Sequence, residues 1–315
     1  MSSRVISALP SNPPYCGRFA PSPTGPLHFG SLLAAVGSYL DARSNGGIWR
    51  LRMEDVDQPR CQSGAAEDIL HTLAGFGFEW DGPVLYQSRC ADRYRQSFEN
   101  LRLSGRIFPC ACSRRELADS RLIQQASDGA QIYPGTCRAG LLPGKAARSW
   151  RLRVADEVIA FEDRVQGRVA QNLANEVGDF VLLRAEGCFA YQLAVVADDA
   201  EQGITHVVRG ADLLDSTPRQ ILLQRLLGLS TPLYAHLPVA VNAAGEKLSK
   251  QTRAAPLSIA TPQSVVRALW NALIFLGQLP PTELRQAGLP ELWQWALAHW
   301  SLAQVPRQHS LPVAG

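Results

Sequence analysis

The sequence predicts an α/β fold built on a parallel sheet. An extended run over residues 15–20, a helical pattern that begins at Phe29 and a strand over 48–53 follow one another with tight turns between them. This order is typical of a parallel strand–helix–strand unit, whose first loop lies at the carboxyl edge of the sheet. Two continuous apolar runs, 189–196 and 204–210, read as further strands from the buried centre of such a sheet.

The loop between the first predicted strand and helix has the composition of an anion-binding turn. Three prolines and a glycine lie between residues 21 and 26, so neither a helix nor a strand can run through it. The helix start offers unpaired N–H groups and a partial positive charge. Gly30 allows a nucleotide to approach closely, and His28 can hydrogen-bond to a phosphate oxygen. The alternative is a proline-rich turn before a core helix with an exposed His28, and the spacing fits both.

Composition and charge restrict the class of protein. The chain has 315 residues, 46% of them hydrophobic, and a net charge of +3 at pH 7. A nucleic-acid partner would therefore be held by a local basic patch rather than by overall charge. Residues 1–14 read as a flexible tail without a signal peptide, and no run is long enough to cross a bilayer. The seven cysteines are odd in number and scattered, so we expect a soluble, cytoplasmic protein without a disulfide framework.

The loop resembles the signature of a known family. Residues 18–25 read RFAPSPTG and residues 27–30 read LHFG, which is similar to class I glutamyl-tRNA synthetases, with residues 28–31 in the place of their HIGH tetrapeptide. Ser31 replaces its second histidine, as in a shortened branch, the glutamyl-Q tRNA(Asp) synthetases. The resemblance implies a Rossmann nucleotide-binding domain of the class I type. It also implies a glutamate site that includes Arg18, Phe19, Ala20, Pro21 and Ser22, and an ATP site that includes His28, Gly30 and Ser31.

Acidic residues end the strand that follows. Glu54, Asp55 and Asp57 lie within four positions, and acids at the carboxyl end of a strand can hold an ammonium group or a metal ion. A solvated strand end is the alternative. The resemblance implies that Glu54 binds the amino-acid substrate. Helices are then predicted over 63–74, with Ser63 as the cap, and over 89–103.

Three cysteines suggest a metal site. Cys110 and Cys112 are one residue apart, and Cys137 follows the loop. Thiolates in this arrangement favour zinc, although three ordinary thiols are the alternative. Tyr133, Glu116 or water could complete the site, because no histidine lies between residues 72 and 205. The resemblance implies a structural Zn²⁺ bound by Cys110, Cys112, Tyr133 and Cys137.

The middle of the chain reads as an insertion. Short β segments occur at 150–154, 158–161 and 180–184, so we predict a zinc-containing α+β subdomain over 105–185, in the position of the family's acceptor-stem domain. The Rossmann domain would comprise 15–104 and 186–245. Residues 246–315 would form a lysine loop and a small helical region, with helices over 264–275 and around 290–300.

The second half of the predicted sheet carries the other substrate residues. The Tyr191 hydroxyl and the planar guanidinium of Arg209 could face a substrate site. The alternatives are that Tyr191 packs in the core and that Arg209 lies on the surface. The run from 191 to 220 is close to the family pattern, which assigns both to the glutamate site. A helix capped by Ser216 and a strand over 234–241 follow.

The lysine loop reads Glu246-Lys247-Leu248-Ser249-Lys250-Gln251. Two lysines three residues apart after a glycine suit a mobile clamp on a triphosphate, and a solvated loop is the alternative. The loop resembles the KMSKS motif, which implies that Lys247 and Lys250 bind ATP and that Lys250 is catalytic. Gln251 stands in place of its last serine.

The resemblance implies the following activity. The chain would activate L-glutamate with ATP and Mg²⁺ to glutamyl-adenylate without tRNA, then transfer the glutamyl group to queuosine in the anticodon of tRNA(Asp). Only 65 residues follow Lys250, too few for the long anticodon-binding region of a full glutamyl-tRNA synthetase. The alternatives are a truncated synthetase that charges a tRNA 3′ end, a glutamate-activating enzyme with a non-tRNA acceptor, and a catalytically inactive RNA-binding paralogue.

Overall fold

The computed structural model describes residues 14–118, 132–242, 244–248 and 255–313. Its strands are β1 (Cys16–Phe19), β2 (Ile48–Met53), β3 (Leu85–Tyr86), β4 (Ile107–Cys110), β5 (Ser149–Leu152), β6 (Val158–Asp163), β7 (Gly167–Asn172), β8 (Val181–Leu183), β9 (His206–Gly210), β10 (Leu233–Leu237), β11 (Val239–Val241) and β12 (Ser310–Pro312). Its α-helices are α1 (Phe29–Ser44), α2 (Ala65–Gly75), α3 (Ala91–Leu103), α4 (Arg114–Ala118), α5 (Leu173–Glu176), α6 (Tyr191–Glu201), α7 (Thr217–Leu227), α8 (Pro262–Phe275) and α9 (Leu289–His299).

Parallel strands form the central layer. β1, β2 and β3 pair in parallel, and so do β9 and β10. β1 lies alongside β9, and Thr205 N donates a hydrogen bond to Cys16 O at 2.9 Å where the two strands begin. The layer therefore has the order β3-β2-β1-β9-β10, with the strands that flank the predicted substrate site next to each other. The predicted α/β fold with a parallel sheet is confirmed.

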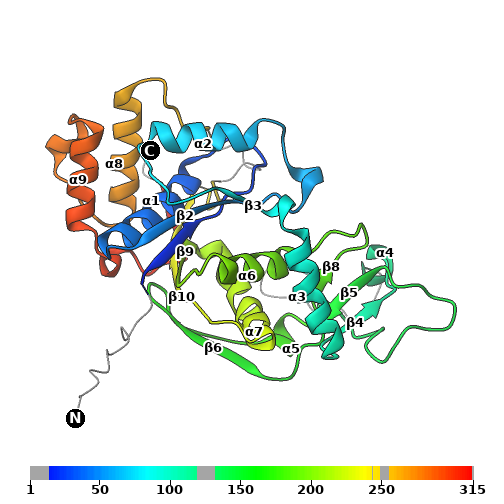
Figure 1. The fold of residues 1–315 in the computed structure, drawn as a ribbon. Helices are drawn as coiled ribbons and strands as arrows, with labels where there is room; N and C mark the ends of the chain where they lie inside the picture. Colours follow the sequence, from blue (N-terminus) through cyan, green and yellow to red (C-terminus); the bar gives the residue numbers. More distant parts are fainter. Residues whose placement is uncertain (1–13, 119–131, 243, 249–254, 314–315) are drawn as a thin grey trace, which may run out of the picture.

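Helices cover both faces of this layer (Figure 1). α1, α2, α8 and α9 lie on one side, where Trp49, Leu73 and Leu269 are buried in one apolar cluster. α3, α6 and α7 lie on the other side, where Leu101 and Leu193 belong to a second cluster. Since apolar surface is buried on both faces, the sheet is held rigidly and its strand ends have fixed positions.

The segment between α3 and α6 adds strands that do not belong to the parallel layer. β4, β5 and β8 form an antiparallel sheet, and β6 and β7 form a hairpin. The hairpin reaches back to β10 and α7, so it packs against the central layer. The β segments expected over 150–154, 158–161 and 180–184 are confirmed, whereas the domain boundaries stay a prediction.

Three local predictions were wrong. Residues 191–201 form helix α6 and not a strand, because the segment is buried on several sides and its continuous apolar run does not distinguish the two. Ser63 does not cap α2, which begins after Gly64 in a left-handed conformation with φ of 77°. The strand expected over 234–241 is interrupted at Pro238, which separates β10 from β11; proline cannot donate to a strand ladder.

Candidate active site

The start of α1 lies at the carboxyl edge of the central layer. His28 is the N-cap residue, and its Nδ1 accepts a hydrogen bond from Ser31 N at 3.4 Å. A Cβ atom at Gly30 would lie 3.2 Å from Leu248 O, so the helix start and the lysine loop approach each other closely, and a side chain at residue 30 would crowd this contact. Leu257 N also donates to Leu27 O at 2.9 Å. The segments on either side of residues 249–254 therefore both contact the helix start.

A cavity of about 470 Å³ opens at this edge. The residues predicted for the two substrates all line it, apart from Lys250: Arg18, Phe19, Ala20, Pro21, Ser22, Glu54, Tyr191 and Arg209 for glutamate, and His28, Gly30, Ser31 and Lys247 for ATP. Lys250 and Gln251 lie outside the described residues. The structure thus brings together side chains separated by up to 229 positions (18 and 247) around one space of the size that small-molecule ligands occupy.

One wall of the cavity holds a buried charge network. Asp199 Oδ1 lies 3.4 Å from Arg18 Nε and 2.8 Å from Arg52 Nη1, and Arg52 Nη2 lies 3.3 Å from Glu54 Oε1. The Arg52 side chain is fully buried, and that of Glu54 is 9% exposed. Two arginines and two carboxylates therefore balance one another beside the cavity, which keeps Arg18 and Glu54 in fixed positions.

The two carboxylates in this network have opposite pKa shifts. Burial raises the pKa of Glu54, and the nearby Arg52 and Arg18 reduce this shift without cancelling it. Burial also disfavours the charged form of Asp199, but Arg52 and Arg18 outweigh it and lower the pKa of Asp199. Asp199 therefore serves as the internal counter-ion, whereas a further cation beside Glu54 would stabilise its charged form.

Arg209, near the carboxyl end of β9, lines the same cavity. Its Nε donates to His236 Nε2 at 3.1 Å, and its Nη2 donates to Thr217 Oγ1 at 2.8 Å. Its Nη1 is buried and has no hydrogen-bond partner among the described residues. Tyr191 opens helix α6 and lies on the same cavity. An arginine with one unused edge can bind a carboxylate that enters the cavity.

Sequence reasoning missed the residues that support these side chains. Asp199, Arg52, His236 and Asp163 carry no motif of their own, and only the adjacent acids Asp198 and Asp199 at the end of an apolar run gave a signal. Asp212 was also missed, and its Oδ2 lies 2.6 Å from Lys247 Nζ. Each of them acts through contacts between distant parts of the chain, which spacing does not show.

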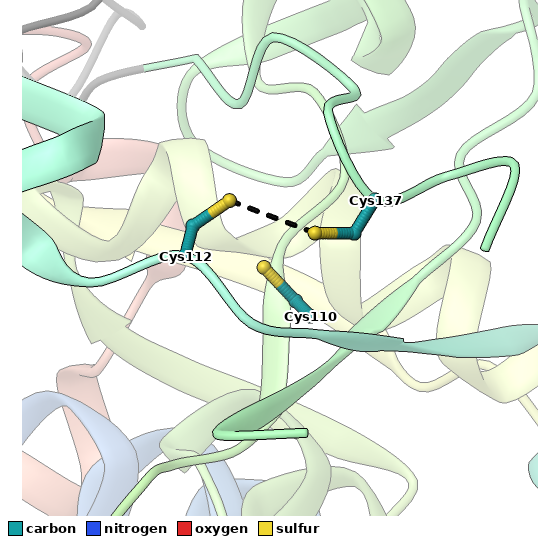
Figure 2. A group of neighbouring side chains, drawn as sticks. All are labelled: Cys110, Cys112 and Cys137. Carbon is teal, nitrogen blue, oxygen red and sulfur yellow. Dashed lines mark hydrogen bonds between the residues drawn. The ribbon is translucent and has the colours of Figure 1, made fainter. Parts of the chain in front are cut away.

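The predicted cysteines form a cluster at β4 and the loops beyond it. The Sγ atoms of Cys110, Cys112 and Cys137 all lie within 4.8 Å of one another, and their side chains point toward a common centre (Figure 2). Tyr133 Oη lies 3.5 Å from Cys110 Sγ and 3.7 Å from Cys112 Sγ. We call these four residues the cysteine cluster.

The chemistry of the cysteine cluster fits a soft divalent metal. Arg151 Nε donates to Cys110 Sγ at 3.4 Å. Burial opposes the thiolate form, but hydrogen bonds from Tyr133 and Arg151 outweigh it and lower the pKa of Cys110 to about 7. The Glu116 carboxylate is not part of the group and accepts from Ser113 N at 2.7 Å. Three thiols at these distances offer the soft donors that zinc prefers, and the Tyr133 hydroxyl lies beside two of them.

In the described part of the chain, no helix has the length and apolar character that crossing a bilayer requires.

Known proteins with similar sequences and folds are class I synthetases of the glutamyl type. The family "tRNA synthetases class I (E and Q), catalytic domain" matches residues 16–280. Glutamyl-Q tRNA(Asp) synthetase from Aromatoleum aromaticum is 64% identical over 303 residues, covering 96% of this chain and 94% of that protein. Glutamyl-Q tRNA(Asp) synthetase from Dechloromonas aromatica is 62% identical over 297 residues, covering 94% and 97%. The glutamate-tRNA synthetase structure from Elizabethkingia anophelis has a TM-score of 0.78 at 26% identity, covering 96% of this chain and 68% of that chain.

Proposed function

Since the chain belongs to the glutamyl-Q tRNA(Asp) synthetase family of class I synthetases, we propose that it is a ligase that glutamylates queuosine in tRNA(Asp). Glutamate would first be activated with ATP in the absence of tRNA. A carboxylate oxygen of glutamate attacks the α-phosphorus, the bond from that phosphorus to pyrophosphate breaks, and glutamyl-adenylate forms. A hydroxyl of the queuosine cyclopentenediol ring then attacks the glutamyl carbonyl carbon, and AMP leaves.

The observation that carries the proposal is the position of one largely buried carboxylate, Glu54, and two buried arginines, Arg18 and Arg209, around one cavity. Glu54 would bind the α-ammonium group of glutamate, because a cation beside it would offset the burial that raises its pKa. Arg18 and Arg209 would bind substrate carboxylate, and Tyr191 and residues 19–22, which line the same cavity, would shape the pocket. A substrate with one ammonium and two carboxylate groups matches this distribution of charge.

The part of the cavity at the start of α1 suits ATP. His28, Gly30 and Ser31 lie where the positive dipole of α1 and the N–H groups of its first turn favour phosphate. Lys247 lines the same space, and Lys250 would act from the same loop as the catalytic phosphate contact. Mg²⁺ would bind the ATP phosphates and neutralise their charge. The protein's part is to position glutamate against the α-phosphorus and to stabilise charge as the transition state forms.

We propose that the cysteine cluster holds a structural Zn²⁺. Cys110, Cys112 and Cys137 would supply thiolates and Tyr133 a phenol oxygen, which gives a closed site of four ligands. Zinc there would hold the loops beyond β4 to the antiparallel sheet. None of the four residues lines the substrate cavity, so the metal would take no part in the chemistry.

ATP–pyrophosphate exchange tests the first step. Purified protein is incubated with ATP, labelled pyrophosphate and one of a panel of amino acids, without tRNA. We expect exchange with L-glutamate and at least about 100-fold less with glutamine or aspartate, because the buried charges of the cavity would be left unpaired by either. Absence of exchange with every amino acid would favour an inactive paralogue.

Transfer of labelled glutamate tests the acceptor. tRNA(Asp) that carries queuosine is compared with tRNA(Asp) that lacks it, both with intact 3′ ends. We expect label only on the queuosine-containing tRNA. Equal labelling of the two would identify the enzyme as a truncated synthetase that charges the 3′ end.

A further inference from the structure

The anchoring of Arg209 extends beyond the cavity to residues that carry no motif. Arg209 Nη2 donates to Thr217 Oγ1 at 2.8 Å and to Leu213 O at 3.3 Å, and Nε donates to His236 Nε2 at 3.1 Å. The guanidinium is thus held along one edge. Nη1 remains as its donor group without a partner among the described residues. The orientation of Arg209 therefore depends on whether His236 presents a hydrogen-bond acceptor.

Asp163 determines which nitrogen of His236 carries the proton. His236 Nδ1 lies 2.6 Å from Asp163 Oδ2, and an ionised carboxylate can only accept, so Nδ1 must carry a hydrogen. Arg209 Nε can only donate, so Nε2 must be the unprotonated nitrogen. Both contacts are satisfied by a single neutral form of the ring, protonated on Nδ1. Both side chains are fully buried, which removes water as an alternative partner.

The charge states agree with this arrangement. Burial lowers the pKa of His236 to about 4, with the Arg209 charge acting in the same direction and Asp163 opposing. Burial disfavours the charged form of Asp163, but its hydrogen bonds from His236 and the backbone outweigh this and lower its pKa. A protonated imidazole would bring a second cation against Arg209 and would lose the acceptor.

Backbone groups in the turn of the β6–β7 hairpin hold the Asp163 carboxylate in position. Asp163 Oδ1 accepts from Val165 N at 3.0 Å, from Gln166 N at 2.8 Å and from His236 N at 3.1 Å. One carboxylate therefore joins the hairpin to β10, and β10 lies next to β9 with Arg209 paired to His236 in register. Three residues in contact, Asp163, His236 and Arg209, thus connect the hairpin to the cavity.

We propose that Asp163 and His236 are a positioning pair for the substrate, which hold the Arg209 guanidinium so that Nη1 is left to bind a carboxylate of glutamate. The proposal rests on the proposed function of the cavity. It assigns to the β6–β7 hairpin a direct part in glutamate recognition, although the hairpin itself does not line the cavity. Neither residue touches the substrate.

Asp163→Asn tests the pair, with Asp179→Asn as the matched control. The asparagine keeps an oxygen for the three backbone N–H groups, but its amide group donates to His236 Nδ1 and so moves the ring proton to Nε2, against Arg209. Asp179 matches Asp163 in burial, each residue being 4% exposed; it accepts from Val154 N at 2.8 Å and does not line the cavity. We expect Asp163→Asn to raise the KM for glutamate in exchange about 10- to 100-fold and to change the KM for ATP less than twofold.

Asp179→Asn should change neither KM, even if it lowers thermal stability. Equal effects of the two variants on the KM for glutamate would overturn the proposal, because they would indicate a general effect of losing a buried carboxylate. So would an Asp163→Asn variant that changes both KM values alike.

Nitrogen NMR of histidine-labelled protein separates this proposal from the function of the cavity. The signal of His236, identified by its loss in His236→Gln, should show a proton on Nδ1 in the wild type and on Nε2 in Asp163→Asn. A wild-type ring protonated on Nε2 or on both nitrogens at pH 7 overturns the positioning pair whatever the activity. The expected ring form together with no glutamate-dependent exchange would instead contradict the proposed function.

Discussion

The substrate cavity and the cysteine cluster both concentrate ionisable groups, but they balance charge in different ways. At the cavity, Asp199 pairs with Arg18 and Arg52, and Glu54 pairs with Arg52. In the cysteine cluster, three thiols and a phenol lie together, and the described cation that contacts a thiol is Arg151. The cavity therefore contains its own counter-charges and should keep its shape without substrate. The cysteine cluster needs a metal ion to become a stable set of thiolates.

Removing an internal counter-charge of the cavity should have the largest effect. Asp199→Asn leaves the buried guanidiniums of Arg18 and Arg52 with Glu54 as their remaining charged partner in the network. We expect the free energy of unfolding to fall by about 3 to 5 kcal/mol, because breaking a buried ion pair leaves an uncompensated charge. Urea denaturation measures this loss, and glutamate-dependent exchange should fall at least about 100-fold at a temperature where the variant is folded.

The control for this variant is the exposed pair of Asp92 with Arg95 on α3. Asp92→Asn should change the unfolding free energy by less than about 1 kcal/mol, since exposed ion pairs contribute little. If Asp199→Asn is as mild as this control, the cavity does not depend on internal counter-charges.

The cysteine cluster should respond to the loss of a neighbouring cation through its metal affinity. Three thiolates with Zn²⁺ carry a net negative charge, and Arg151 offsets it by donating to Cys110 Sγ and lying 4.0 Å from the centre of the Tyr133 ring. We expect Arg151→Met to weaken zinc binding about 10- to 100-fold, as is usual when a residue that hydrogen-bonds to a metal ligand is lost. Competition with a chromogenic zinc chelator measures the change.

Arg153 provides a matched control on the same segment. Its guanidinium lies over the Phe108 ring at 4.9 Å, whereas the hydrogen bond to Cys110 Sγ comes from Arg151. Arg153→Met should keep the wild-type zinc affinity, and both variants should keep glutamate-dependent exchange within about twofold. Purified wild-type protein without bound zinc, or equal effects of the two substitutions, would contradict the proposed metal site.

Local spacing predicted the parts of both regions that lie close together in sequence. The turn before α1, the start of the helix at Phe29 and the strand after it followed from prolines, glycines and apolar periodicity. The cysteines at 110, 112 and 137 also carry their own spacing signal, and the structure brings them together.

The supporting residues could not be predicted in this way. Asp199 lies 181 positions from Arg18, and His236 lies 73 positions from Asp163. Such pairs depend on which strands and helices become neighbours, and a single buried acid or histidine reads as an ordinary core residue. Helix α6 was predicted as a strand for a related reason, because an apolar run buried on several sides has no period that separates the two.

The smallest expected effect is a pH dependence of the free energy of unfolding that comes from His236, behind the cavity. In the unfolded chain His236 has its ordinary pKa of 6.5, whereas burial lowers the pKa to about 4 in the folded protein, beside Asp163, Arg209 and Asp212. As pH falls below 6.5, the unfolded state takes up a proton that the folded state does not, so stability falls with pH until about pH 4. Between pH 6.5 and 5.5 this contribution should amount to about 1 kcal/mol.

The His236→Gln variant lacks the titrating group, while the glutamine amide oxygen can still accept from Arg209. The unfolding free energy of this variant should therefore fall by about 1 kcal/mol less than that of the wild type over the same interval. Urea denaturation at pH 7.5, 6.5 and 5.5 measures the difference, and parallel pH profiles for the two proteins would mean that His236 is not held neutral against Arg209.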